Sequence, residues 1–96
     1  MKNQVHIAIQ IVPVTKEAAY PIIDKAIEVI DKSSVDYRVG AMETVMQGNY
    51  DELMKIAKKA QEVCLSSGAD EIVVTMKIHA KKDSGVTWEE KLDQHG

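Results

Sequence analysis

Two runs of alternating residues, one near each end of the chain, place the strongest constraint on its fold. In the first, Gln4 to Val12, every second position from Val5 to Ile11 is isoleucine or valine. The second, Glu71 to Ala80, repeats this alternation. A period of two predicts a strand with one buried face. Pro13 is expected to end the first strand, because proline cannot donate to a strand ladder.

Two segments with helical spacing follow these strands. Pro21 suits the first position of a helix, where its missing N–H costs nothing. Asn49 with Glu52 three residues later resembles a capping box at the start of a second helix, and Gly68 predicts its end. The apolar positions recur at helical intervals in both segments. They are Ile23, Ala26, Ile27 and Ile30 in the first, and Leu53, Ile56, Ala57, Ala60, Val63 and Cys64 in the second.

The segment between the helices predicts two short strands with a tight reversal. We expect the strands at Tyr37–Val39 and Glu43–Gln47, joined near Gly40 and Ala41. The resulting order, β-α-β-β-α-β, predicts an α+β fold of the ferredoxin-like sandwich type. Its four-stranded antiparallel sheet would carry both helices on one face. We expect one domain over residues 1–96, with a short C-terminal helical tail over residues 87–96.

The composition excludes several classes of partner and compartment. The chain has 96 residues and a formal net charge of −3, without the clustered basic face that nucleic acid requires. A single cysteine, Cys64, allows no internal disulfide and is expected to be a buried, inert thiol. No apolar segment is long enough to span a bilayer. Polar residues interrupt the apolar run near the N-terminus, whereas a signal peptide would need an uninterrupted apolar region. We therefore expect a cytoplasmic protein that binds neither membranes nor nucleic acid.

One face of the predicted sheet has no helix to cover it. The residues that would share this face are mixed in polarity, and the apolar members favour contact with another subunit. A homodimer or homotetramer formed through sheet faces or edges is therefore expected. The residues on this face are His6, Ala8, Gln10, Val12, Val73, Thr75, Lys77 and His79.

Most catalytic and metal-binding arrangements that a ferredoxin-like fold can carry are absent. There is no C-x-x-C pair for metal, and the only arginine, Arg38, is not placed for a phosphate loop after the first strand. No aromatic residue lies on the two long strands to stack a base. His6 and His79 could lie close together, but without a third ligand we expect ordinary polar residues. No metal or cofactor is therefore expected.

Polar and polarizable residues in the central segment are the remaining candidates for a site. Glu43 follows the reversal, where it is either a solvated carboxylate or one that recognises a cation or an amino group. Thr44 either satisfies its hydroxyl locally or binds a ligand. Met42 and Met46 either fill gaps in a core or interface or form a pliable ligand wall.

Three segments of the chain resemble a known family. VHIAIQIVP, VGAMETVMQG and GADEIVVTMKIH are similar to the small thiamine-binding protein family, and the resemblance covers Val5 to Lys91. It implies a ferredoxin-like fold, assembly as dimers or tetramers, and binding of thiamine or its hydroxymethyl-pyrimidine part. It also implies a role in salvage, transport or sequestration rather than catalysis. Many members have Gly-Thr where this chain has Glu43 and Thr44, so Glu43 either narrows the pocket or supplies a new anion.

The resemblance leads to a hypothesis of non-catalytic thiamine binding at a subunit interface on the sheet. Amide and hydroxyl groups would contact the aminopyrimidine, Glu43 would offset the thiazolium cation, and Lys77 would suit a phosphorylated ligand. Two alternatives stay open: a ligand-free regulatory or oligomerisation module, and an enzyme acting on a small pyrimidine or phosphorylated substrate. The candidate ligand-binding residues are Gln10, Met42, Glu43, Thr44, Met46, Gln47, Lys77 and His79.

Overall fold

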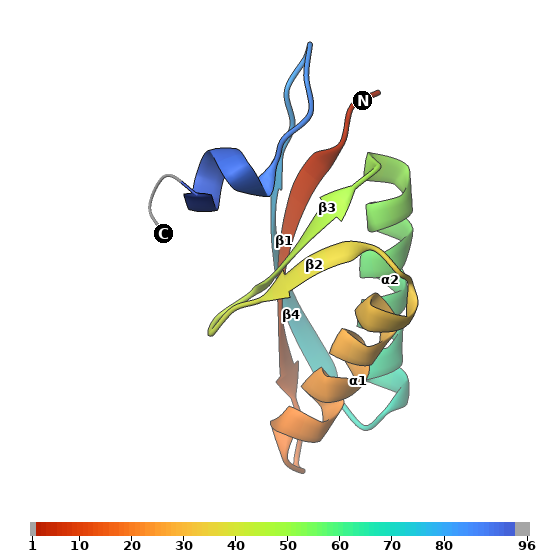
Figure 1. The fold of residues 1–96 in the computed structure, drawn as a ribbon. Helices are drawn as coiled ribbons and strands as arrows, with labels where there is room; N and C mark the ends of the chain where they lie inside the picture. The colour runs from red at the N-terminus through yellow and green to blue at the C-terminus, as the bar shows by residue number, and fades with distance from the viewer. Residues whose placement is uncertain (1, 94–96) are drawn as a thin grey trace.

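The computed structural model describes residues 2–93, and its sheet carries both long helices on one face (Figure 1). The sheet is antiparallel, with four strands in the order β2-β3-β1-β4. This confirms the predicted α+β fold. The elements are β1 (Val5–Val14), α1 (Ala19–Lys32), β2 (Asp36–Val39), β3 (Thr44–Gly48), α2 (Tyr50–Ser66), β4 (Glu71–His79) and a short helix, η1 (Glu89–Asp93). Residues 94–96 of the predicted tail lie outside the described part of the chain.

The main core lies between the sheet and the two long helices. Ile7 on β1, Met46 on β3 and Leu53 on α2 are fully buried there. A second cluster, between α1 and α2, contains Ala26, Ala60 and Cys64. Burial raises the pKa of the Cys64 thiol, in keeping with the inert role expected from the sequence.

Strand β1 continues through Pro13, so the predicted end of this strand was wrong. Pro13 pairs with Ile72 and Val14 with Glu71 on β4. The Val14 carbonyl accepts a hydrogen bond from the N–H of Asp70, so the backbone N–H and C=O of Val14 point toward β4. Because these groups alternate along a strand, the backbone groups of Pro13 point away from β4. On the side away from β4, no strand pairs with β1 at Pro13, since the pairing of β1 with β3 ends at Ile9. The missing N–H of Pro13 therefore costs no ladder hydrogen bond.

The helix boundaries follow local signals, with one shift. The side chain of Asn49 accepts a hydrogen bond from the Glu52 N–H (3.2 Å), which confirms the predicted cap of α2. Gly68, just beyond α2, has a φ of 119°, a conformation that favours glycine. Helix α1 begins at Ala19, which places Pro21 at its third position, still within the first turn where N–H groups lack helical partners. No helix among residues 2–93 has the length and apolar character needed to cross a membrane.

The β2–β3 hairpin presents its side chains to two different faces. The Gly40 N–H donates to the Glu43 carbonyl (2.8 Å) and closes the loop, so Glu43 belongs to the turn and β3 begins at Thr44. Thr44 pairs with Ile9, and Gln47 pairs with His6. Because alternate residues point to opposite faces, Thr44 points toward the helices and Gln47 toward the open face of the sheet.

The C-terminal segment covers part of the sheet face that was expected to lack any intramolecular cover. We call residues 81–93 the C-terminal strap; it folds back over the face opposite the helices (Figure 1). Val86 is fully buried, and its N–H and carbonyl both pair with Gln4 (3.1 and 2.8 Å). His6 is only 2% exposed, so the expectation that this part of the face has no cover within the chain was wrong. Farther along the sheet, Val12 and Val73 stay exposed on the same face.

Candidate functional site

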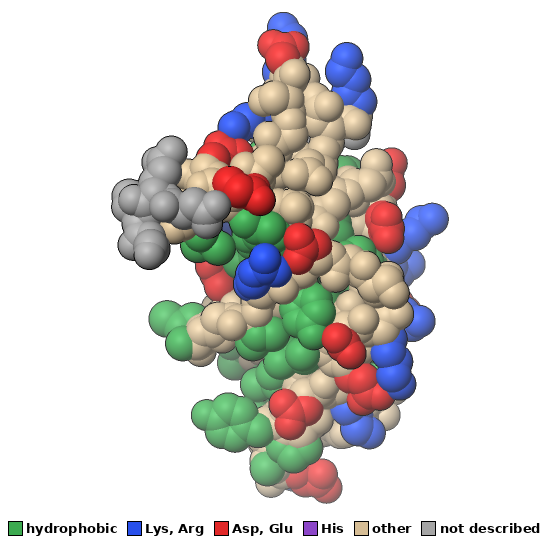
Figure 2. Space-filling model, in the orientation of Figure 1, with side chains coloured by type: hydrophobic (Ala, Val, Ile, Leu, Met, Phe, Trp, Pro, Cys, Tyr) green, Lys and Arg blue, Asp and Glu red, His purple; other side chains and the backbone are tan. Residues whose placement is uncertain are grey.

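A groove lies beside the half of β1 that β3 leaves unpaired. Strand β1 pairs with β4 as far as Val14 but with β3 only as far as Ile9. The space between this free edge, the start of α1 and the hairpin loop has a volume of about 600 Å³. We call it the edge groove. Figure 2 shows hydrophobic side chains gathered between the hairpin and the lower end of the molecule. The polar and charged residues that line the edge groove include Gln10, Asp24, Glu43 and Thr44, and its wall also carries the exposed side chains of Tyr20 and Met42.

The polar groups of the edge groove are few and lie among apolar walls. Thr44 is 7% exposed, and its hydroxyl has no hydrogen-bond partner within residues 2–93. Tyr20 and Met42 project from α1 and the hairpin loop and are 80% and 77% exposed. Large apolar side chains with this exposure are available to pack against a flat ring. The groove therefore combines hydrophobic contact with a small number of orienting groups, as ligand sites commonly do.

The charged residues that line the edge groove are all acidic. Asp24 from α1 and Glu43 from the hairpin loop contribute carboxylates, and no lysine or arginine is among the lining residues that the structure describes. Glu43 also pairs with Lys77 of β4 (3.1 Å), and this pair spans β1 on the open face. The Lys77 side chain is 69% exposed, so solvent screens the pair and Glu43 keeps part of its influence on a ligand.

The structure brings together only half of the residues that the sequence suggested. Gln10, Met42, Glu43 and Thr44 line the edge groove, and Lys77 reaches it through its ion pair with Glu43. Met46 is 0% exposed in the main core and does not line the groove. The two remaining candidates, Gln47 and His79, lie at the other end of the sheet, beside His6.

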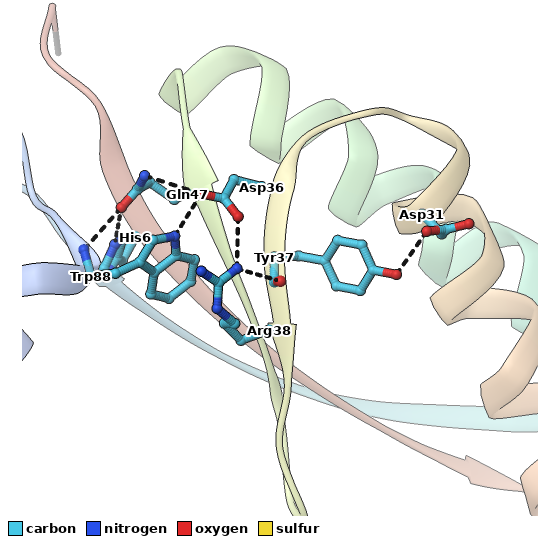
Figure 3. Close-up of polar contacts among 7 residues, drawn as sticks. All are labelled: His6, Asp31, Asp36, Tyr37, Arg38, Gln47 and Trp88. Carbon is cyan, nitrogen blue, oxygen red and sulfur yellow. Dashed lines mark hydrogen bonds and ion pairs between the residues drawn. The ribbon is translucent and has the colours of Figure 1, made fainter. Parts of the chain in front are cut away.

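Gln47 is occupied by a network that holds the C-terminal strap (Figure 3). Its Oε1 accepts from the His6 Nε2 (2.9 Å) and from the Trp88 backbone N–H (3.2 Å). The Trp88 indole N–H donates to Asp36 Oδ2 (2.7 Å). The same ring stacks on His6 at 4.4 Å between centroids and lies 4.7 Å from the Arg38 guanidinium carbon. These contacts tie the strap to β1, β2 and β3.

The strap network favours a neutral His6. Burial lowers the pKa of His6 most strongly, and the neighbouring positive charges of Lys91 and His79 lower it further. The hydrogen bond that His6 Nε2 donates to Gln47 and the negative charge of Glu90 act in the opposite direction and raise the pKa. The Lys91 ammonium lies 2.9 Å from His6 Nδ1, where it can donate only to an unprotonated nitrogen. Protonation of His6 would therefore break this contact and set two positive charges against each other.

We expect the free energy of unfolding to fall as pH drops below about 6.5, the ordinary pKa of histidine. The folded-state pKa of His6 lies below this value, so the unfolded chain binds the proton more readily and stability is lost as pH falls toward the folded pKa. Urea unfolding between about pH 8 and pH 5 measures the effect. His6→Gln should flatten this dependence, whereas His79→Gln should largely keep it. Equal slopes in the wild type and His6→Gln would contradict the assignment.

Several residues around the groove and strap were missed by the sequence reasoning. Tyr20 and Asp24 were not among the predicted site residues, yet both line the edge groove. Asp36 and Trp88 join through the strap, although 52 residues separate them. Trp88 carried a usable signal, because a lone tryptophan in a polar tail indicates that the tail packs on something.

The arrangement is suited to binding a flat, positively charged molecule. Its walls are apolar, its charges are carboxylates, and the Thr44 hydroxyl can donate or accept. Within residues 2–93, no group of three or more histidine, cysteine, aspartate or glutamate side chains is placed to hold a metal ion.

Comparisons with known proteins identify the family of this chain. The sequence model of a family described as thiamine-binding protein matches residues 7–96. A UPF0045 protein of Clostridium perfringens is 40% identical over 91 residues, covering 94% of this chain and 95% of its own. A Bacillus cereus structure, described as a domain of unknown function, has a TM-score of 0.94 and 41% identity, covering 98% of this chain and 91% of its own.

A further solved structure carries a functional description. It is a Thermotoga maritima protein assigned provisionally to thiamine biosynthesis or salvage. It matches with a TM-score of 0.87 and 29% identity, over 97% of this chain and 99% of its own. The family match spans nearly the whole chain and agrees with the resemblance carried by the central segment. The chain belongs to the thiamine-binding protein family.

Proposed function

We propose that the edge groove binds unphosphorylated thiamine or its hydroxymethyl-pyrimidine part without catalysing a reaction on it. The observation that carries the proposal is the charge of the groove: its only charged lining residues within the described chain are Asp24 and Glu43. Thiamine has a cationic thiazolium ring, which carboxylates attract. A phosphate ester would be repelled by the same groups, so the free vitamin is favoured over its diphosphate.

Thr44 supports an orienting role toward the aminopyrimidine. Thr44 lines the groove and is only 7% exposed, and because no fully buried side-chain oxygen or nitrogen within residues 2–93 lacks a partner, its unengaged hydroxyl must be accessible from the groove. Gln10 offers an amide that can both donate and accept at the same site. Such a pair suits a ring that carries both an amino group and ring nitrogens. The rest of the ligand would lie against the exposed side chains of Tyr20 and Met42.

A second copy of the chain would complete the site. Tyr20 and Met42 are too exposed to enclose a ligand alone, and Val12, Val14 and Val39 extend the same apolar surface. Contact between two copies across this surface would remove it from water and narrow the groove. This supports a homo-oligomer with the ligand near a subunit interface, and a salvage, transport or sequestration role for the bound vitamin.

Calorimetric titration tests the proposal. We expect saturable binding of thiamine and affinity at least about tenfold weaker for thiamine diphosphate, because phosphate adds negative charge to an acidic groove. Thr44→Val, which removes the hydroxyl at nearly constant volume, should weaken thiamine binding roughly three- to tenfold. Lys77→Met should tighten it a few-fold, since it frees Glu43 from its ion pair. Light scattering during the same titration reports the assembly.

Titration with hydroxymethyl-pyrimidine, which lacks the thiazolium cation, separates the effect of ligand charge from the effect of contacts to the pyrimidine ring. Its affinity should fall in Thr44→Val but stay unchanged in Lys77→Met. Lys16→Met removes an exposed lysine that does not line the groove and serves as the control for net charge. Absence of heat and of a thermal shift with both ligands would overturn the proposed function. Tighter binding of the diphosphate would overturn the charge argument alone.

A further inference from the structure

A second groove lies on the outer side of the molecule, between the two long helices. It has a volume of about 520 Å³ and is formed by the second half of α1 and by one side of α2. We call it the helix groove. It lies on the helix layer, whereas the edge groove lies beside the hairpin and the start of α1. The residues that matter for its chemistry are Lys25, Val29, Lys32, Lys55, Lys59 and Val63.

The charge of the helix groove is opposite to that of the chain. Four lysines and one glutamate, Glu28, line it, so it carries a net charge of +3 in a chain whose formal net charge is −3. Glu28 pairs with Lys32 on the same helix, four residues away. The remaining lysines, on α1 and α2, have no ion pair within residues 2–93. The excess negative charge therefore lies elsewhere on the surface.

The lysines form two rims along an apolar floor. Lys25 and Lys32 stand seven residues apart on α1, or roughly 10 Å along its axis. Lys55 and Lys59 are one turn apart on α2. Between the rims lie Val29 and Val63, both only half-buried. An open channel with an apolar floor and basic edges has the cross-section that a third, amphipathic helix would fill.

We propose that the helix groove docks an acidic amphipathic helix of a partner protein. Its apolar stripe would lie over Val29 and Val63, and its glutamate or aspartate residues would pair with the lysines of both rims. Charge complementarity selects this occupant, because the groove carries a net charge of +3 in a chain whose formal net charge is −3, so an acidic partner is attracted to the groove more than to the chain as a whole. This inference does not depend on the function of the edge groove.

The chemistry of the lining disfavours other anionic occupants. The lysines are spread along the groove instead of converging on one point, as a site for a single phosphate group would require. Among the described residues, no arginine and no aromatic side chain lines the helix groove, so this lining lacks the bidentate and stacking groups that nucleic acid binders use. The end of α1 contributes Lys32 and Ser33, and a helix C-terminus does not attract anions.

Fluorescence anisotropy with a defined probe tests the proposal on the full chain. The probe is a labelled synthetic helix of about 20 residues, with leucines at helical spacing and glutamates on both flanks. We expect saturable binding that weakens as salt rises from about 50 to 300 mM. The triple variant Lys25→Glu, Lys55→Glu, Lys59→Glu should weaken binding at least about tenfold. Amide NMR shifts on adding the probe should concentrate in residues 25–33 and 55–67.

The matched control reverses the same number of charges outside the groove. Lys16, Lys58 and Lys82 are exposed and do not line it, so their replacement by glutamate should change affinity less than the groove variant. Circular dichroism confirms that both variants are folded. Equal weakening in the two variants, or equal binding of a probe with scrambled leucines, would overturn docking in the groove. Competition by inorganic pyrophosphate or by a DNA oligonucleotide at similar affinity would assign a general anion site instead.

Discussion

Replacing Trp88 by alanine is expected to lower the free energy of unfolding by about 3–5 kcal/mol, the usual cost of removing a buried tryptophan. The indole packs on His6, donates to Asp36 and faces the Arg38 guanidinium. Loss of the ring leaves a cavity over β1 and an Asp36 carboxylate without its indole donor. For a chain of 96 residues the melting temperature should fall by about 10 °C or more. Urea unfolding followed by circular dichroism measures the change.

The site of the loss can be located as well as its size. Because the strap is tied down mainly at Val86 and Trp88, its amide protons should exchange faster in Trp88→Ala, while those of β1 and α2 change less. Tyr20→Ala is the matched control, since this aromatic is 80% exposed and its removal should change stability by only about 0.5 kcal/mol or less. A Trp88→Ala protein as stable as Tyr20→Ala would contradict the packing of the strap.

Replacing Met46 by alanine should cost about 2–5 kcal/mol of stability and leave the affinity of the folded protein for thiamine nearly unchanged. Met46 is fully buried in the main core, beside Ile7 and Leu53, and does not line the edge groove. The cavity left by its side chain explains the loss. Met46→Leu, a swap of similar volume, should cost less than about 1.5 kcal/mol. Thermal unfolding and calorimetric titration together give both quantities.

Met42 gives the opposite expectation and serves as the matched control. It is the same residue type four positions earlier, 77% exposed and part of the groove wall. Met42→Ala should change stability by only about 0.5 kcal/mol or less and weaken thiamine binding a few-fold. If Met46→Ala lost affinity and Met42→Ala did not, the ligand would lie in a different place from the edge groove.

Local patterns in the sequence were sufficient for the architecture. Alternation in β1 and β4, the cap at Asn49 and the stop at Gly68 all appear in the structure. These features depend on backbone geometry within a few residues, which the sequence states directly. The shared face of His6 and His79 was also predicted, because the order of strands and a period of two determine which side chains lie together.

The site residues were harder to predict, because their exposure depends on partners far along the chain. Thr44 and Met46 both point toward the helices, yet Thr44 borders the groove and Met46 is sealed in the core. The difference arises from the end of the β1–β3 pairing at Ile9, which opens space beside Thr44. The sequence of the central segment does not encode how far β1 extends beyond the end of its pairing with β3.

By itself, the sequence determined the elements, their order, the α+β sheet and the family resemblance, because these depend on periodicity, caps and short motifs. Only the tertiary structure decided which polar residues are buried and which face a groove. It placed Trp88 and the C-terminal strap over His6, engaged Gln47 in the network beneath, and set Asp24 and Thr44 in the lining of one groove. The physical reason is that burial and electrostatic environment are set by contacts between distant segments, which no local pattern specifies.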